Sequence, residues 1–366
     1  MALEINRRRA LEGLGALAFA GFASGANAST SSTLGSAANG VGVLFGAAAG
    51  NQIYTDAAYA NLFREANLIT SEWQFKMAAL QPTRGVYEYW HADNLLAYTT
   101  RTGKKLKAHC GFWRAFNPAW MTGLSTSELQ YIFDKHIDTV VPRYAGRVYA
   151  WDVANEPFWP ADNLPGGFGD GPWYQAYGAG WIERAFRRVS ALDPSARLYL
   201  NEAQCDNNGA GLGPVIRPAL LQLVDRLKNV GVPIYGVGLE SHLDMGMAYD
   251  DGQFGVYCGQ LANKGVKIAI SELDVRDFTL PDDTASRDKL IAARIQGFLT
   301  QTLAVPAVDQ IVTWGLSDKY GWLKALWQEQ HGSTVRQPRP LLFDENMQKK
   351  PAWTAVSNAL HSRRRA

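Results

Sequence analysis

Eight short apolar runs recur along the chain at intervals of 25 to 50 residues, and this repetition constrains the fold more than any other feature. Each interval can hold the crossover helix that parallel strands require. Apolar residues recur at helical spacing within four intervals, at 56–66, 173–192, 215–230 and 289–303. The runs centre near Val43, Leu68, Leu106, Val148, Leu198, Ile234, Ile268 and Ile311. The pattern predicts one (β/α)8 barrel, a TIM barrel, over residues 41–361.

An open, doubly wound sheet is the alternative fold. Its first strand is usually followed by a glycine-rich phosphate loop, whereas Gly40 and Gly42 precede the first apolar run of this chain. A length of 366 residues would also allow two domains. No linker rich in Pro or Gly divides the eight units, so we expect a single domain.

The composition excludes several partners. Lys plus Arg number 36 and Asp plus Glu 34, so the net charge of +2 offers no basic field to nucleic acid. Beyond the N-terminus no run of 18 apolar residues predicts a membrane span. The three cysteines form no disulfide framework, although a Cys110–Cys205 pair stays open, and no Cys/His cluster has metal-ligand spacing. We expect no metal, no cofactor and a monomeric chain.

The first 28 residues have the features of a signal peptide. Three arginines at 7–9 precede an apolar stretch at 14–23, and Ala26-Asn27-Ala28 fits the small-x-small cleavage pattern. The paired arginines indicate the twin-arginine route, and an amphipathic N-terminal helix is the alternative. Residues 29–40, rich in Ser, Ala and Gly, are expected to form a flexible leader. The sequence thus predicts a bacterial protein exported to the periplasm or the medium.

Two glutamates lie where a barrel of this kind carries its chemistry, at the carboxyl ends of strands. Glu156 follows the fourth apolar run and Glu272 follows the seventh. Strands four and seven face each other across the barrel mouth. Glycoside cleavage needs two carboxyl groups on either side of the bond that breaks, so this placement suits it. Two ordinary salt bridges at strand ends would account for the same placement.

The residues around both glutamates resemble the two signatures of glycoside hydrolase family 10, the endo-β-1,4-xylanases. The signatures are Trp-Asp-Val-Ala-Asn-Glu at 151–156 and Ser-Glu-Leu-Asp-Val at 271–275. Similar segments follow in the family's order at 107–120, 236–242, 313–322 and 340–352. The resemblance covers almost the whole chain after the signal peptide, and it implies the barrel predicted above.

The resemblance also implies residue roles. Glu156 would be the general acid and then the general base, and Glu272 the nucleophile, with retention of configuration and carboxyl groups about 5–5.5 Å apart. Asn155 would hold the sugar 2-hydroxyl, and His242 would bridge Glu272 and Asp274 to orient the nucleophile. Substrate contacts are implied for Lys76, His109, Trp113, Asn155, His242, Trp314 and Trp322. The implied substrate is xylan or a xylo-oligosaccharide.

Several positions depart from the family's pattern. Trp73 and Phe116 stand where the family has an Asn and a Gln that bind the second sugar on the non-reducing side of the cut. Glu240 stands where the family has Gln, and an ionised Glu cannot donate to the nucleophile. At 201–204, Asn-Glu-Ala-Gln replaces Asn-Asp-Tyr-Asn and removes an aromatic ring from the leaving-group side. We expect unchanged chemistry, an altered glycone subsite and, through Glu240, an altered pH dependence.

The sequence therefore predicts a retaining endo-1,4-β-xylanase. A retaining β-glycosidase for decorated, short or non-xylan substrates is an alternative that Trp73 and Phe116 leave open. A sugar-binding protein without activity is another, and the presence of both glutamates opposes it. A phosphate-binding isomerase or aldolase would need a glycine-rich phosphate site after strands seven and eight or a Schiff-base lysine, and neither is present.

Overall fold

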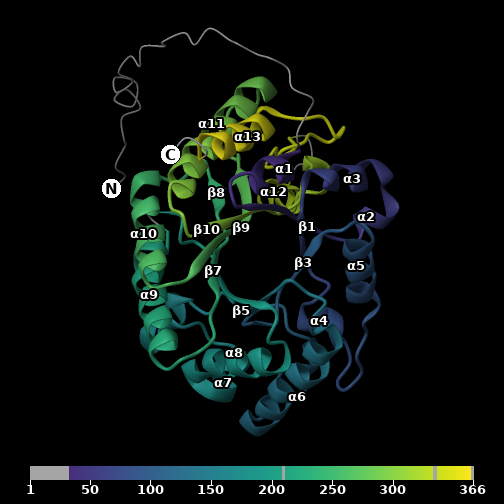
Figure 1. Cartoon of the computed structure of the whole chain (residues 1–366), viewed down its shortest axis with the longest axis vertical. Helices are drawn as coiled ribbons and strands as arrows, with labels where there is room; N and C mark the ends of the chain where they lie inside the picture. Colours follow the sequence, from purple (N-terminus) through teal and green to yellow (C-terminus); the bar gives the residue numbers. More distant parts are fainter. Residues whose placement is uncertain (1–32, 208–210, 333–335, 364–366) are drawn as a thin grey trace. The chain divides into compact units, whose positions relative to one another are not determined.

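The computed structural model describes residues 33–207, 211–332 and 336–363, and eight parallel strands within them close into a barrel (Figure 1). Each strand pairs with the next in parallel, and β10 pairs with both β9 and β1, which closes the ring. The strands are β1 (Leu44–Ala49), β2 (Leu68–Ser71), β3 (Lys105–Ala108), β5 (Ala150–Asn155), β6 (Arg197–Glu202), β7 (Gly236–Leu239), β9 (Lys267–Arg276) and β10 (Val308–Thr313). The predicted (β/α)8 barrel is confirmed, and each strand lies at or beside a predicted apolar run.

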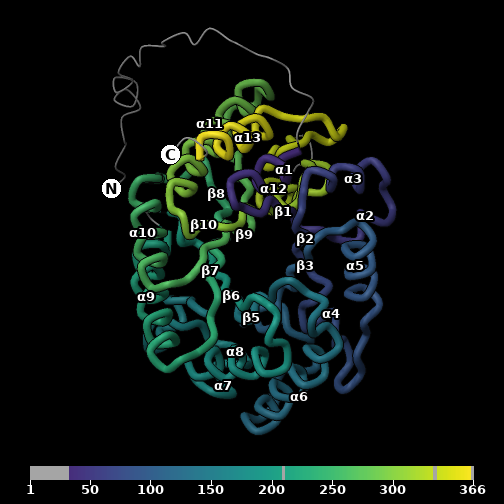
Figure 2. The backbone as a smooth tube through the Cα atoms, in the orientation of Figure 1, coloured from purple at the N-terminus to yellow at the C-terminus, as the bar shows by residue number. Residues whose placement is uncertain are grey.

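Helices surround the ring of strands, as the backbone trace shows (Figure 2). They are α1 (Leu34–Asn39), α2 (Gln52–Thr55), α3 (Ala57–Leu62), α4 (Met77–Leu80), α5 (Trp90–Arg101), α6 (Thr126–Tyr144), α7 (Pro172–Tyr177), α8 (Trp181–Leu192), α9 (Gly213–Asn229), α10 (Asp251–Asn263), α11 (Thr284–Leu303), α12 (Leu323–His331) and α13 (Pro351–Arg363). Two short strands, β4 (Phe112–Trp113) and β8 (His242–Asp244), pair with β5 and β9. None of these helices of the described chain is long and apolar enough to span a bilayer.

The four segments expected from the sequence to be helical each contain a helix, and one of them is divided into two helices. Residues 173–192 hold two helices, because Gly178 takes a left-handed φ of 56° that glycine adopts readily. A 3-10 turn at Gly178–Gly180 then leads into α8. Each of the three cysteines, Cys110, Cys205 and Cys258, is buried and has a free thiol. The disulfide between Cys110 and Cys205 that the sequence left open is therefore not formed.

The expected flexible leader at 29–40 is wrong for residues 33–40. Thr33 accepts a hydrogen bond from the Ser36 N–H and caps α1. Leu34, Ala37 and Ala38, at helical spacing, are buried in the main core. The folded domain therefore begins at Thr33 rather than at residue 41. The expected signal peptide at 1–28 and the rest of the leader lie outside the described residues.

Buried polar side chains fill the barrel interior and support the site above them. Lys107 Nζ lies 2.8 Å from Asp152 Oδ1 and 4.6 Å from the centre of the Tyr199 ring. The Tyr199 hydroxyl in turn accepts a hydrogen bond of 2.5 Å from Gln310. These contacts join β3, β5, β6 and β10 across the interior. They fix Asp152, which is the hydrogen-bond partner of His109 at the mouth.

Candidate active site

Glu156 directly follows β5 and is held in an uncommon backbone conformation. Its φ is 44°, and its N–H donates a hydrogen bond of 2.9 Å to the Asn201 carbonyl on β6. Non-glycine residues with such angles are strained and concentrate at functional sites. The Trp113 indole on β4 donates to Glu156 Oε2 over 2.9 Å. Backbone and side chain together therefore fix this carboxyl group at the mouth.

Glu272 lies within β9, is buried, and has a donor at each carboxyl oxygen. Oε1 accepts a hydrogen bond of 2.8 Å from the Asn201 side chain, and Oε2 lies 3.3 Å from His242 Nε2. His109 Nδ1 lies 3.9 Å from Oε1. Burial alone would raise the pKa of Glu272, but the positive charges of His109 and His242 and the His242 hydrogen bond lower it below its usual value. The group is therefore ionised, as a nucleophile must be.

His242 stands between Glu272 and Asp274, as the resemblance implied. Its Nδ1 lies 2.9 Å from Asp274 Oδ1, and the Trp322 indole donates to Asp274 Oδ2 over 2.7 Å. Burial opposes the charge on this ring, but the Asp274 and Glu272 carboxylates raise the pKa of His242 well above its usual value. Trp322 thus orients Asp274, and Asp274 orients a protonated His242 towards the nucleophile.

His109 is fixed from inside the barrel. Its Nδ1 lies 3.1 Å from Asp152 Oδ2, and Asp152 is held in turn by Lys107. Burial would lower the pKa of His109, but the neighbouring Cys110 side chain, the charge of Glu272 and the hydrogen bond to Asp152 raise it to about 10. A second cation therefore stands beside Glu272 at neutral pH.

The remaining predicted contacts form the wall around these groups. The Trp314 ring lies 5.3 Å from the His109 ring and 6.3 Å from the His242 ring, between centres. Lys76 Nζ lies 4.7 Å from the Trp113 ring and 5.9 Å from the Trp314 ring. The structure thus brings the predicted tryptophans, histidines and lysine around both glutamates.

The two aromatic residues that depart from the family's pattern, Phe116 and Trp73, have different surroundings in the structure. Phe116 stacks on Trp113, with ring centres 6.2 Å apart and planes at 22°, and 57% of its surface is exposed. Trp73, in the loop after β2, packs against His91 with ring centres 4.5 Å apart. Phe116 therefore joins the wall beside Glu156, whereas Trp73 contacts the start of α5.

Asn201, at the end of β6, connects the predicted residues, although it was not among them. Its Nδ2 lies 2.8 Å from Asn155 Oδ1, 2.8 Å from Glu272 Oε1 and 3.2 Å from Glu240 Oε1. Its Oδ1 accepts from the Ser271 hydroxyl over 2.6 Å, which fixes the orientation of the amide. The available sequence signal was a polar residue at the carboxyl end of the fifth apolar run.

The comparisons with known proteins agree with this geometry. Residues 33–359 match glycosyl hydrolase family 10. The chain belongs to this family. It is 32% identical over 320 residues to an endo-1,4-β-xylanase of Agaricus bisporus, covering 85% of this chain and 89% of that protein. It is also similar to xylanase 10B of Thermotoga maritima (TM-score 0.80, 28% identity, 90% of this chain and 98% of that one). A xylanase 10B of Thermotoga petrophila solved with xylobiose gives a TM-score of 0.81, with 28% identity and 91% and 98% coverage.

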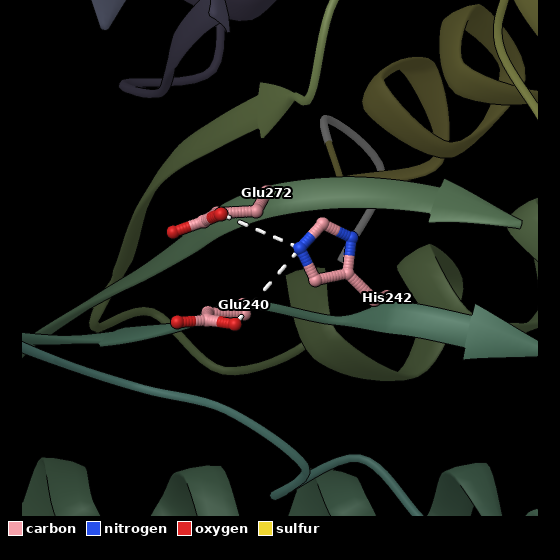
Figure 3. A group of neighbouring side chains, drawn as sticks. All are labelled: Glu240, His242 and Glu272. Atoms are coloured by element: carbon pink, nitrogen blue, oxygen red, sulfur yellow. Dashed lines mark ion pairs between the residues drawn. The ribbon is translucent and has the colours of Figure 1, made fainter. Parts of the chain in front are cut away.

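Glu240 adds a carboxyl group beside the nucleophile, at a position where the family resemblance implied a Gln. Figure 3 shows Glu240 and Glu272 on the same side of His242, with Nε2 of the ring 3.9 Å from Glu240 Oε2. Burial and the charges of Glu272 and Glu156 raise the pKa of Glu240 well above its usual value. Glu240 therefore holds its proton more tightly than an ordinary carboxyl group, as expected for one of two adjacent carboxyl groups.

Glu240, His242 and Glu272 form one group among the described residues whose possible metal-ligand atoms lie within 4.8 Å of one another. The chemistry of His242 argues against a metal there, because its raised pKa keeps both ring nitrogens protonated and a ligand must offer a lone pair. The group is better described as a proton-rich hydrogen-bond cluster around the family's nucleophile.

A cavity of about 260 Å³ adjoins this cluster on the β6–β7 side. Glu240, His242 and Trp322 line it towards the site, and Gln204 and Met247 line it further out. This is the leaving-group side implied by the family resemblance, where Ala203 and Gln204 replace a Tyr and an Asn. The site therefore has open space on the side where a leaving sugar would sit.

Proposed function

We propose that this family 10 glycoside hydrolase is an endo-1,4-β-xylanase that cleaves xylan or xylo-oligosaccharides with retention of configuration. The observation that carries the proposal is the unequal setting of two carboxyl groups at one mouth. Glu272 is kept ionised by His109, His242 and Asn201, whereas Glu156 is positioned by a single indole N–H. Endo-1,4-β-xylanase relatives such as that of Agaricus bisporus support the substrate class.

In the first step, Glu156 gives its proton to the glycosidic oxygen while Glu272 Oε attacks the anomeric carbon. The bond from this carbon to the leaving sugar breaks, and an ester bond to Glu272 forms. The negative charge of the nucleophile disappears in this step. Glu156, now a carboxylate, takes a proton from water, and the hydroxide formed attacks the anomeric carbon and releases Glu272. The two inversions leave the configuration unchanged.

The residues around Glu272 stabilise its negative charge, which disappears and returns during the reaction. His109 and His242 stabilise the carboxylate before attack and again as it leaves the sugar. Asn201 and His242 each hold one Glu272 oxygen, which fixes the carboxylate before it attacks the substrate. Asn155, aligned by the same amide, is then placed to meet the sugar 2-hydroxyl.

The deciding experiment is product analysis on linear xylan and on xylohexaose, with the Glu272→Ala variant as the control. We expect the wild type to release oligosaccharides from internal bonds, with products first formed as β-anomers in proton NMR. Release of the α-anomer would contradict retention, and release of single xylose units alone would contradict internal cleavage. Binding of xylohexaose without turnover would favour the sugar-binding alternative.

A finer proposal concerns the glycone side. Trp73 and Phe116 add volume and remove hydrogen-bond donors at positions where the family has Asn and Gln. The exposure of Phe116 beside Trp113 supports a reshaped subsite, because this ring is free to contact a ligand. We infer that linear xylan binds at this subsite less well than a decorated chain does. Relative kcat/KM values on linear xylan and arabinoxylan test the preference.

We also propose that the enzyme is exported through the twin-arginine route. The arginines at 7–9, the apolar stretch at 14–23 and the Ala26-Asn27-Ala28 site carry this proposal. Fractionation of cells that express the full chain should place the activity outside the cytoplasm. Substitution of Arg8 and Arg9 by lysine should retain an uncleaved precursor inside, and normal export of this variant would contradict the route.

A further inference from the structure

Trp90, the first residue of α5, has the highest relative exposure of the tryptophans that the structure describes. Its relative exposure is 64%, and its ring lies 4.7 Å from the His91 ring, between centres. Single exposed apolar side chains are common and need no explanation. Trp90 differs because it is the outer member of a row of rings.

The row leads to the barrel mouth. His91 contacts Trp73 with ring centres 4.5 Å apart, and Trp73 follows the carboxyl end of β2. His91 Nδ1 also lies 3.2 Å from Asn51 Nδ2, and Asn51 follows the carboxyl end of β1. The catalytic Glu156 follows the same end of β5, and Glu272 lies within β9. Trp73, His91 and Trp90 thus extend outwards from the mouth on the β1–β2 side, where α2 and α5 lie next to each other (Figure 1).

The chemistry of this row suits a neutral sugar chain. An indole ring covers the C–H face of a pyranose with apolar surface, and its N–H can meet a hydroxyl group. The Asn51 amide and the His91 ring add polar groups beside it, which ligand sites use to fix orientation. Trp73 and Trp90 both contact the His91 ring, so the aromatic groups and the amide lie together.

We infer that Trp90 and His91 form an outlying sugar subsite, which binds the xylan chain where it leaves the mouth past Trp73. The inference rests on the proposed function for its ligand, a β-1,4-linked xylose chain. A substrate long enough to reach Trp90 gains this contact, and a shorter one does not. Trp90 therefore sets a preference for chain length rather than the rate of bond cleavage.

The test is a chain-length series from xylotriose to xylohexaose with Trp90→Ala, Trp90→Phe and the wild type. The ratio of kcat/KM for Trp90→Ala to that of the wild type should fall with length, to about one fifth on xylohexaose. Trp90→Phe, which keeps a ring, should recover most of this loss. Tyr131→Ala is the matched control, because Tyr131 is 66% exposed on α6 and its ratio should not depend on length.

A ratio for Trp90→Ala that is the same at every length, or a fall that Tyr131→Ala reproduces, would overturn the inference. The wild type's turnover of the series tests the proposed function separately. If the wild type cleaves none of these sugars, titration with xylohexaose decides. Weaker binding by Trp90→Ala would then support the subsite, and equal or undetectable binding by both proteins would overturn it.

Discussion

The side-chain amide of Asn201, on β6, lies 2.8 Å from Oε1 of Glu272, on β9, and holds the nucleophile in place. The same nitrogen reaches Asn155 and Glu240, so one amide sets the relative positions of three site residues. Its orientation depends on Ser271, whose hydroxyl donates to the amide oxygen. Asn201 is therefore a positioning residue, and its removal should affect the chemical step more than binding.

Asn201→Ala should lower kcat on xylan on the order of a hundredfold, the effect of losing one preorganised donor, with a smaller change in KM. Asn229→Ala, on the exposed end of α9, is the control and should leave both constants unchanged. Gly238→Ala tests the same contact from the other side, because a Cβ there would lie 2.0 Å from Asn201 Oδ1. A normal kcat in either site variant would contradict the positioning role.

The roles of the two glutamates can be separated with azide. Glu156→Ala should lose about 10²- to 10⁴-fold in kcat on xylan, and much less on an aryl β-xyloside whose leaving group needs no proton. Azide should then accelerate turnover of the aryl substrate and give a β-xylosyl azide. Glu272→Ala with azide should give the α-product, because a single inversion takes place. Reversed products would exchange the two assignments, and wild-type enzyme in azide is the control.

Glu240→Gln should become progressively more stable than the wild type as pH rises. Burial and the charges of Glu272 and Glu156 raise the pKa of Glu240 well above its usual 4.5 in the folded protein. Between these two values the unfolded chain has lost this proton while the folded chain keeps it. Folding is therefore penalised increasingly as pH rises through this window, and the penalty is absent below it. The glutamine has no proton to lose and escapes the penalty.

Thermal unfolding between about pH 4 and about pH 8 measures this effect, and the Tm difference should grow by on the order of 2 °C. Glu88→Gln, at an exposed position, should show a flat difference. One limb of the pH–activity profile should move in Glu240→Gln as well, because Glu240 and Glu272 share the Asn201 amide. A Tm difference that does not vary with pH would mean that Glu240 is not a buried neutral acid.

Replacement of Trp73 by Asn together with Phe116 by Gln should raise kcat/KM on linear xylan and change the pattern of products. The exchange removes ring volume and restores two hydrogen-bonding side chains at the glycone side. Chromatography of early products from linear xylan measures the pattern. Identical products from the wild type and the double variant would show that these rings do not shape the subsite.

The sequence predicted the eight strands because parallel strands that are buried on both faces are continuous apolar runs. Such a run can be recognised from the local sequence alone. The sequence also placed Glu156 correctly at the end of its strand, whereas Glu272 lies within β9, which continues to Arg276. Helix α1 was missed because Ser, Ala and Gly around Thr33 suggested a linker, although Leu34, Ala37 and Ala38 have helical spacing. The sequence indicated that one carboxyl group of the pair Glu240 and Glu272 would have a raised pKa, but not which one. That assignment and the role of Asn201 depend on side chains that meet only when the barrel closes.

Helix α1 has a consequence for how the chain can be rearranged. It packs against α13, and Arg363 at the end of α13 donates to the Val308 carbonyl at the start of β10. Because β10 pairs with β1, the two ends of the folded domain meet at the seam where the first and last strands join. A linker from Arg363 to Thr33, with new termini opened in a surface loop, should therefore give a circular permutant. Its strands would keep the same order around the barrel. A support or fusion partner attached at this seam would leave the carboxyl ends of the strands open to a polymer.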